Sequence, residues 1–389
     1  MVTTQTADNA LKSFYLDAVS DALNTTVNPF LAQIKQSTSD VTGKDVRKLV
    51  RYGVNGGIGA GTEAGDLPTA GGNNYVQFVS TLKNLYGTIE ISDKAIRASA
   101  NNEGAFVDLL NDEMQALVRS SAFNFGRMLY GDGSGVIATV EGVDGNVITM
   151  NSVTGLAEGM LIDFYDGSAV VAVARKRTVI AVDRENKTIT IDGAALTETT
   201  LPLGCGAVLQ HSYNCELTGL AAIFSDSETL YGVDRASHPF LKPYVMADVG
   251  GIDDTVLQLA IDKIEENSGS KVNFIVCSWG VKRALANYFS QMRTYAPTME
   301  IKGGYKAMSI NGIPVVADRF CPAGTMYLLN TDDFRLHQLC DWQWLEGEDG
   351  KILKQVPGKP VYTATLVKYA ELICERPYGQ GMITGIDEE

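Results

Sequence analysis

The feature that most constrains this chain is a glycine-rich segment between two strand-like runs. Residues 53–74 carry eight glycines and almost no large apolar side chains. A loop of this length without secondary structure is uncommon inside a compact domain. Residues 46–52 have the composition of a strand, and residues 75–80 alternate with the period of two that strands show. Two strands joined by a glycine-rich tip predict a long β-hairpin that projects from its own domain.

The longest helical pattern in the chain begins at Asn102 and ends at Tyr130. Its residues at helical spacing, every three or four positions, are Phe106, Leu110, Met114, Leu117, Ser121, Phe125 and Met128. About 28 residues with a rise of roughly 1.5 Å each predict a rod of roughly 42 Å. Glycines at positions 131–135 end the helix, since glycine is the usual residue beyond a helix C-terminus.

The segments before the hairpin and after the long helix predict smaller units. Residues 8–19 predict an amphipathic helix whose apolar face includes Phe14 and Tyr15, and Asn28-Pro29 predicts a second helical start. Residues 136–214 contain short strand-like runs bounded by turn residues. Their spacing predicts a small β-barrel or sandwich inserted into the main domain.

The last third of the chain predicts an α/β domain. A helix pattern runs from Ile252 and closes at Gly269, and a buried strand follows at 274–277. Asn311-Gly312 between two apolar runs is a strong hairpin signal. A final strand is predicted over 365–374.

Motifs that could carry chemistry are weak. The run Gly57–Thr62 suggests a phosphate loop, but the lysine of the Walker form is missing, and Gly65–Pro68 breaks any helix that could follow. The acidic pairs Asp253-Asp254 and Asp332-Asp333 are better explained as helix or turn caps than as acid–base groups.

Other ligand-binding signals are equally scarce. Trp342 and Trp344 lie on one face of an extended segment, where core or intersubunit packing is the commoner role. The six cysteines form no C-x-x-C pair, the three histidines are scattered, and no G-x-S-x-G motif is present. We expect no catalytic residue, no cofactor and no metal.

The charge of the chain also restricts its partners. Its net charge is −14, from 46 acidic and 32 basic residues, and its densest basic run is only Arg175–Arg177. Proteins that wrap nucleic acid neutralise phosphates with clustered cations, so this chain could enclose nucleic acid but is not built to grip it. No apolar run is long enough to span a bilayer, and no signal peptide is recognised, so we expect a cytosolic product with no membrane partner.

Several stretches in this order resemble a known family. They are LYGTIEIS (85–92), FNFGRMLYGDGSG (123–135), IPVVAD (313–318), PAG (322–324), YLLN (327–330) and ELICERP (371–377). Together with the hairpin and the long helix, they resemble the major capsid protein of tailed bacteriophages, which has the Hong Kong 97-type fold that encapsulins share. The resemblance covers nearly all of the chain except 136–214.

The resemblance implies an α+β capsid fold with seven parts. They are an N-terminal arm (1–45), an extended hairpin loop (46–84), a peripheral domain with the spine helix (85–135), an inserted β domain (136–214), a peripheral-domain connection (215–250), an axial α/β domain (251–345) and a C-terminal return to the peripheral domain (346–389). The insert is expected to stiffen the capsomer or to display a surface for a decoration protein.

The same resemblance implies a structural role. It implies self-assembly into hexamers and pentamers of an icosahedral head, assembled in the host cytoplasm, that encloses double-stranded DNA without sequence-specific binding. Expected partners are further copies of the chain, a portal, and separate scaffolding or decoration proteins. Candidate intersubunit contacts are Gly57, Gly59, Gly61, Asp66, Leu67, Pro68, Phe14 and Tyr15. The alternatives are an encapsulin-like compartment, a modular binding protein that uses the insert, and, third, an enzyme.

Two departures from the family pattern carry expectations of their own. Some members cross-link their loops through a lysine near the hairpin tip, but no lysine lies between Arg51 and Lys83. We therefore expect non-covalent locking of the shell. The predicted arm begins almost at Met1, so scaffolding is expected to come from a separate protein or to be unnecessary.

Overall fold

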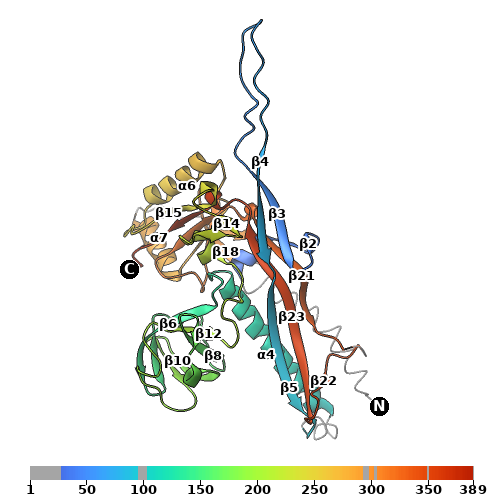
Figure 1. Ribbon diagram of the computed structural model, residues 1–389. Helices are drawn as coiled ribbons and strands as arrows, with labels where there is room; N and C mark the ends of the chain where they lie inside the picture. Colours follow the sequence, from blue (N-terminus) through green and yellow to red (C-terminus); the bar gives the residue numbers. More distant parts are fainter. Residues whose placement is uncertain (1–27, 95–102, 292–297, 302–304, 348–349, 389) are drawn as a thin grey trace.

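The computed structural model describes residues 28–94, 103–291, 298–301, 305–347 and 350–388. Figure 1 shows long paired strands with helix α4 beside them, an α/β unit, a ring of short strands, and a hairpin that projects away from these parts. The α+β class predicted from the sequence is confirmed. The helix predicted over 8–19 lies outside the described residues.

Strand β23 (Val361–Cys374) is the centre of the longest sheet. It pairs antiparallel with the whole of β5 (Lys83–Ser92) on one side and with β21 (Phe334–Trp344) on the other. Two short strands, β22 (Lys354–Gln355) and β1 (Lys35–Ser37), extend this sheet. Since β5 comes from the first quarter of the chain and β23 from its end, the sheet forms only when distant segments meet.

Helix α4 (Glu103–Met128) is the predicted long helix, and it packs against β5. The predicted stripe residues found buried in the main core are Met114, Phe125 and Met128. The side chains of Phe106 and Leu110 lie outside the described ones. A Cβ atom on Gly87 of β5 would lie 3.0 Å from Leu117 of α4, so glycine at this position allows the helix to approach the strand closely.

Helix α2 (Pro29–Gln33) fixes the beginning of the described chain to the same core. Its N-cap Asn28 accepts a hydrogen bond of 2.9 Å from the amide of Leu31 and donates one of 3.4 Å to the carbonyl of Gly126. Phe30 is fully buried, with its ring edge-on to Phe334 at 5.3 Å. The helical start predicted at Asn28-Pro29 is confirmed.

The α/β unit is a seven-stranded sheet with helices α6 (Asp254–Ser268) and α7 (Trp279–Gln291). In spatial order its strands are β15 (Tyr244–Met246), β24 (Gly381–Ile383), β20 (Met326–Leu329), β16 (Phe274–Cys277), β19 (Ile313–Ala317), β18 (Tyr305–Ile310) and β17 (Thr298–Ile301). The predicted signals at its element ends are confirmed. Asp253 caps α6, Gly269 ends it at φ +64°, and Asn311 and Gly312, both at positive φ, join β18 to β19.

Two expectations about this part of the chain are wrong. Strand β21, expected within the axial range, pairs with β23, whereas β24, expected in the peripheral return, pairs with β20 and β15. The edge of β20 needs a partner for its backbone groups, and the C-terminal strand supplies it. Asp332 and Asp333 are not caps either: Asn330 caps their turn, and the two aspartates pair with Lys35 and Arg376.

Residues 136–209 form a closed ring of six strands with one appended strand. The ring order is β10 (Arg177–Asp183), β11 (Thr188–Ile191), β7 (Val147–Met150), β6 (Val136–Asp144), β12 (Gly206–Leu209) and β8 (Leu161–Asp166), with β9 (Ala169–Val170) beside β8. Pairing of β8 with β10 closes the ring, which has its own apolar core. Closure leaves this unit without an open sheet edge along the ring.

The two connections of this ring to the rest of the chain lie side by side. The amide of Asn214 donates to the carbonyl of Ser134 at 2.7 Å, and that of Leu220 donates to Leu129 at 2.8 Å. Arg127, in the last turn of α4, forms an ion pair with Glu216, and both side chains are buried. The ring is therefore an excursion that departs and returns at the end of α4.

Glu371 of β23 ties the returning segment to the long sheet. Its buried carboxylate accepts hydrogen bonds from the amides of Thr218 (2.9 Å) and Leu372 (3.1 Å). Burial raises the pKa of Glu371 to about 7. The pKa of a glutamate is about 4.3 in an unfolded chain, so the folded state binds the extra proton between these two values.

This pKa predicts a pH-dependent stability. Below pH ~4.3 Glu371 is protonated in the folded and the unfolded state, and it does not lower the free energy of unfolding. As the pH rises from there through about 7, that free energy falls, because the folded state holds the carboxyl proton more tightly than the unfolded state does. Urea unfolding of the unassembled Glu371→Gln subunit should show a gain of up to about 3 kcal/mol over wild type at pH 8, and little gain at pH 4. The exposed Glu90→Gln on β5 serves as a control. An unchanged pH profile in Glu371→Gln would contradict this assignment.

Candidate subunit interface

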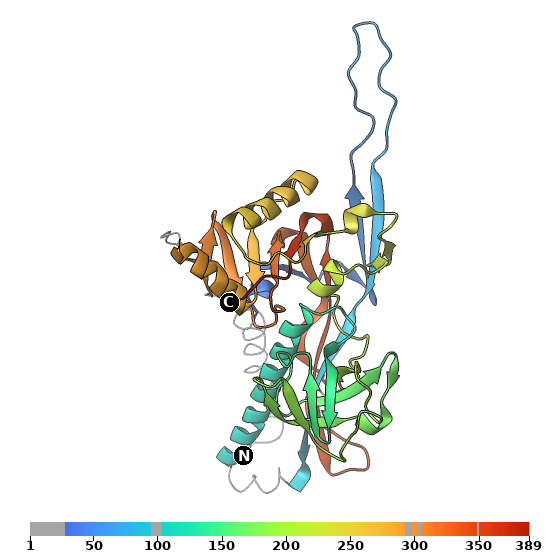
Figure 2. The same cartoon turned by 90° about the vertical axis from the view of Figure 1, so that its left-hand side faces the viewer.

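The projecting hairpin is the most distinctive surface of the molecule. Strands β3 (Asp45–Tyr52) and β4 (Asn74–Thr81) pair antiparallel from Asp45 opposite Thr81 to Tyr52 opposite Asn74, with β2 (Val41–Thr42) as a third strand. Beyond Tyr52 and Asn74 the two limbs continue as an irregular tip, residues 53–73. Figures 1 and 2 show this tip extending away from all other parts of the molecule. The predicted projecting hairpin is present.

The root of the hairpin is firmly packed. Val46 and Phe78 are buried against a turn formed by β13 (Thr229–Leu230) and β14 (Val233–Asp234). Tyr231, within this turn, accepts a hydrogen bond from the amide of Val79 on its carbonyl and one from the amide of Cys374 on its hydroxyl, both at 3.0 Å. Tyr231 therefore links the hairpin to β23, through its backbone carbonyl on one side and its hydroxyl on the other.

The tip depends on glycine for a steric reason. A Cβ atom on Gly57 would lie 2.8 Å from the amide nitrogen of Gly71, and one on Gly71 would clash with the backbone of Gly56 and Gly57. Of residues 53–74, only Gly53 has positive φ. Close approach of the two limbs, more than access to left-handed backbone, thus accounts for the glycines at positions 57 and 71.

The apolar side chains of the tip are almost fully exposed. Val54 is 79%, Ile58 80% and Leu67 90% exposed, and Leu49 and Tyr75 on the strands are also exposed. Large exposed apolar side chains that cluster on one element mark interaction surfaces. These apolar side chains are therefore stabilised little by contacts within their own chain.

Most of the predicted contact residues are exposed. The exposed ones are Gly59, Gly61, Asp66, Leu67 and Pro68, and Gly57 is half-buried by the opposite limb. Phe14 and Tyr15 lie outside the described residues. Sequence reasoning missed Val54 and Ile58, although both are apolar residues in a segment otherwise made of small and polar ones. That contrast was the signal that could have found them.

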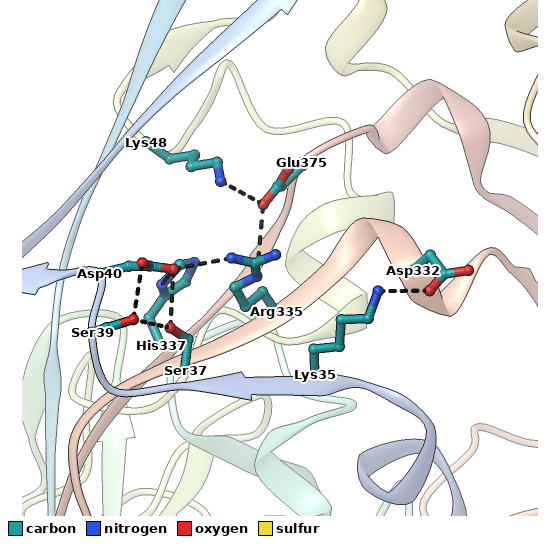
Figure 3. A network of polar contacts seen from close by, with 9 residues as sticks. All are labelled: Lys35, Ser37, Ser39, Asp40, Lys48, Asp332, Arg335, His337 and Glu375. Atoms are coloured by element: carbon teal, nitrogen blue, oxygen red, sulfur yellow. Dashed lines mark hydrogen bonds and ion pairs between the residues drawn. The ribbon is translucent and has the colours of Figure 1, made fainter.

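A polar network fixes the segment that leads into the hairpin (Figure 3). Lys35 pairs with Asp332, Asp40 with Arg335, and Lys48 of β3 with Glu375, each at 3.0 Å. Hydrogen bonding from Ser37, together with the Arg335 guanidinium, holds the pKa of Asp40 below its ordinary value. Each of these partly exposed pairs contributes little alone, but together they fix the direction of the chain as it enters the hairpin.

His337 lies beneath this network and is fully buried. Burial lowers the pKa of its imidazole, so the ring is neutral at pH 7 although Asp40 lies 4.0 Å from Nδ1. Neither ring nitrogen forms a hydrogen bond with the described residues. His337 therefore packs β21 against the segment that leads into the hairpin.

Other candidate ligand sites resolve into packing. Trp342 and Trp344 are buried in the main core, as expected, and the ring of Trp342 lies 6.3 Å from Phe125. Within the described ranges, no three His, Cys, Asp or Glu side chains are grouped so that they could hold a metal ion. None of the described helices combines the length and the apolar character needed to cross a membrane.

Comparisons with known proteins place this architecture. No protein-family profile matches the chain, and neither does any curated protein sequence. Among solved structures, the capsid asymmetric unit of cyanophage A-1(L) superposes with a TM-score of 0.54 and 10% identity, over 95% of this chain and 92% of that one. The holo-SrpI encapsulin complex of Synechococcus elongatus gives a TM-score of 0.47 and 9% identity, over 93% of this chain and 89% of that one.

At a sequence identity of 10%, the similarity to the cyanophage capsid structure shows a shared fold and nothing more. The superposition on the cyanophage capsid protein spans nearly the whole of both chains. The projecting hairpin, the long helix and the α/β unit occur in the order that the resemblance implied. The chain has the Hong Kong 97-type capsid fold, and this prediction is confirmed.

The contrast between root and tip yields a stability prediction. Leu67→Ser and Ile58→Ser should change the free energy of unfolding of the unassembled subunit by less than about 0.5 kcal/mol, because these side chains are exposed. Phe78→Ala at the buried root should cost about 3–5 kcal/mol. Urea titration followed by tryptophan fluorescence measures both. Equal losses in tip and root variants would mean that the tip packs on its own chain.

Proposed function

We propose that this chain is the major capsid protein of a tailed bacteriophage, a subunit that assembles into hexamers and pentamers of an icosahedral head around double-stranded DNA. The observation that carries the proposal is the hairpin tip, whose apolar residues are exposed on a subunit with a capsid fold. A monomeric protein has no evident use for such a segment, whereas a neighbouring copy can cover it.

The direction of the hairpin supports ring formation. Its tip points away from the rest of its own subunit (Figure 2), so we place the surface that covers it on another copy. Contacts between two different patches of identical subunits are heterologous and close into rings when the rotation allows. Many modest contacts of this kind, repeated around a closed shell, give strength through multivalency.

The other parts take roles within this proposal. Of the predicted arm 1–45, α2, β1 and β2 pack on their own subunit, so only the part ahead of α2 is proposed as an arm toward another copy. Residues 85–135 and the long sheet form the peripheral domain, and the α/β unit forms the axial domain. The ring of strands within 136–214 contacts its own or an adjacent subunit. The net charge of −14 suits a shell that encloses DNA without gripping it, in a virion that also contains a portal and separate scaffolding or decoration proteins.

Replacing the tip tests this function. A variant in which Asn-Gly replaces residues 53–73 should keep β3 and β4 paired, because two residues suffice to join Tyr52 to Asn74. We expect a folded subunit that no longer forms closed particles, as judged by size-exclusion chromatography and negative-stain microscopy beside wild type. Closed particles of normal size from this variant would contradict the role of the tip, and a wild-type chain that stays monomeric across salt and concentration would contradict the proposal.

The lysine-free tip predicts how the particles are held together. Because no lysine lies between Arg51 and Lys83, assembled particles boiled in denaturant should run as a single monomer band. A ladder above the monomer would show covalent locking and overturn this expectation. The contents of the same particles, nucleic acid or cargo protein, distinguish a phage head from an encapsulin-like compartment.

A further inference from the structure

A cationic cleft lies where the ring of strands meets the α/β unit. Its volume is about 500 Å³, and its lining consists of Ser152, Val153, Thr154, Arg184, Lys187, Trp279 and Arg319. Three of these seven side chains are cations and none is acidic. In a chain whose net charge is −14, such a local excess of positive charge needs an explanation.

The cations of the cleft are free to meet a partner. Arg184 and Lys187 belong to the turn between β10 and β11, and Arg319 follows β19; all three are exposed. None of them forms an ion pair with a side chain in the described part of the chain. The guanidinium of Arg319 instead lies 4.6 Å from the ring centroid of Phe123, which fixes its direction.

The cleft also presents an apolar surface. Trp279, the first residue of α7, is 57% exposed, although tryptophan is among the residues that gain most from burial. An exposed indole beside three cations matches a partner that carries carboxylates next to apolar side chains.

The hairpin tip of this same chain has that chemistry. Its only charged residues are Glu63 and Asp66, and Asp66 is followed directly by the exposed Leu67 and Pro68. The tip and the ring of strands lie at opposite ends of the molecule in both views (Figures 1 and 2), so the tip cannot fill the cleft of its own subunit. Only the tip of another copy can reach it.

We propose that the cleft between the ring and the α/β unit is the socket for the hairpin tip of a neighbouring copy. Glu63 and Asp66 of that copy face Arg184, Lys187 and Arg319, while Leu67 and Pro68 pack on Trp279. The inference rests on the proposed shell function and adds the receiving surface to it. It also gives the ring of strands a role, since the ring supplies Arg184 and Lys187 and thus one wall of the socket.

Charge reversal tests the socket. Arg184→Glu with Lys187→Glu, or Glu63→Lys with Asp66→Lys, should each raise the critical concentration for assembly about tenfold or more, since two like-charged contacts replace two favourable ones. Combining all four substitutions should bring the critical concentration back to within about threefold of wild type, because opposite charges then face each other again. A tenfold change in this concentration corresponds to ~1.4 kcal/mol. Arg175→Glu with Lys176→Glu, on the same ring but outside the cleft, should leave it unchanged.

The outcomes separate the socket from the shell function. If reversal in the cleft leaves assembly unchanged while replacement of the tip prevents it, the shell function stands and the socket is wrong. Failure of the fourfold variant to regain assembly would also overturn the pairing. If cleft reversal lowers only the nucleic acid content of the particles, the cleft binds phosphates and not the tip. A wild-type chain that never assembles overturns both proposals.

Discussion

The exposure of the hairpin tip is the constraint on which the rest of this structure depends. Val54, Ile58 and Leu67 lie on a segment that touches little except its own opposite limb. Exposed apolar surface of this kind favours association, because covering it removes it from water. The folded subunit therefore leaves apolar side chains of the tip uncovered, and covering them by another copy favours self-assembly.

The structure separates the residues that hold the subunit together from those available for contact. Strand β23 pairs with β5 and β21, and Tyr231 joins this sheet to the hairpin root, so the direction of the hairpin follows from the main core. The ion pairs around Arg335 fix the chain just before the hairpin. Substitutions in the tip can therefore change assembly without changing folding, since tip and core share few contacts.

Local signals in the sequence predicted local structure well. Asp253, Gly269 and Asn311-Gly312 act within a few residues of themselves, and each is found in its predicted role. The pairing of β24 with β20 could not be predicted, because it depends on a contact between segments far apart in the chain. The candidate contact residues were found only in part. Composition drew attention to the glycines, whereas Val54 and Ile58 became evident from their exposure.

A cryo-electron microscopy map of assembled wild-type particles tests the role of the hairpin tip most directly. We expect a closed shell in which density for residues 53–73 of each subunit lies on the neighbouring subunit, with Leu67 covered. A map in which this segment folds back on its own subunit, or remains uncovered in a closed shell, would contradict the claim that the hairpin is a surface completed by another copy.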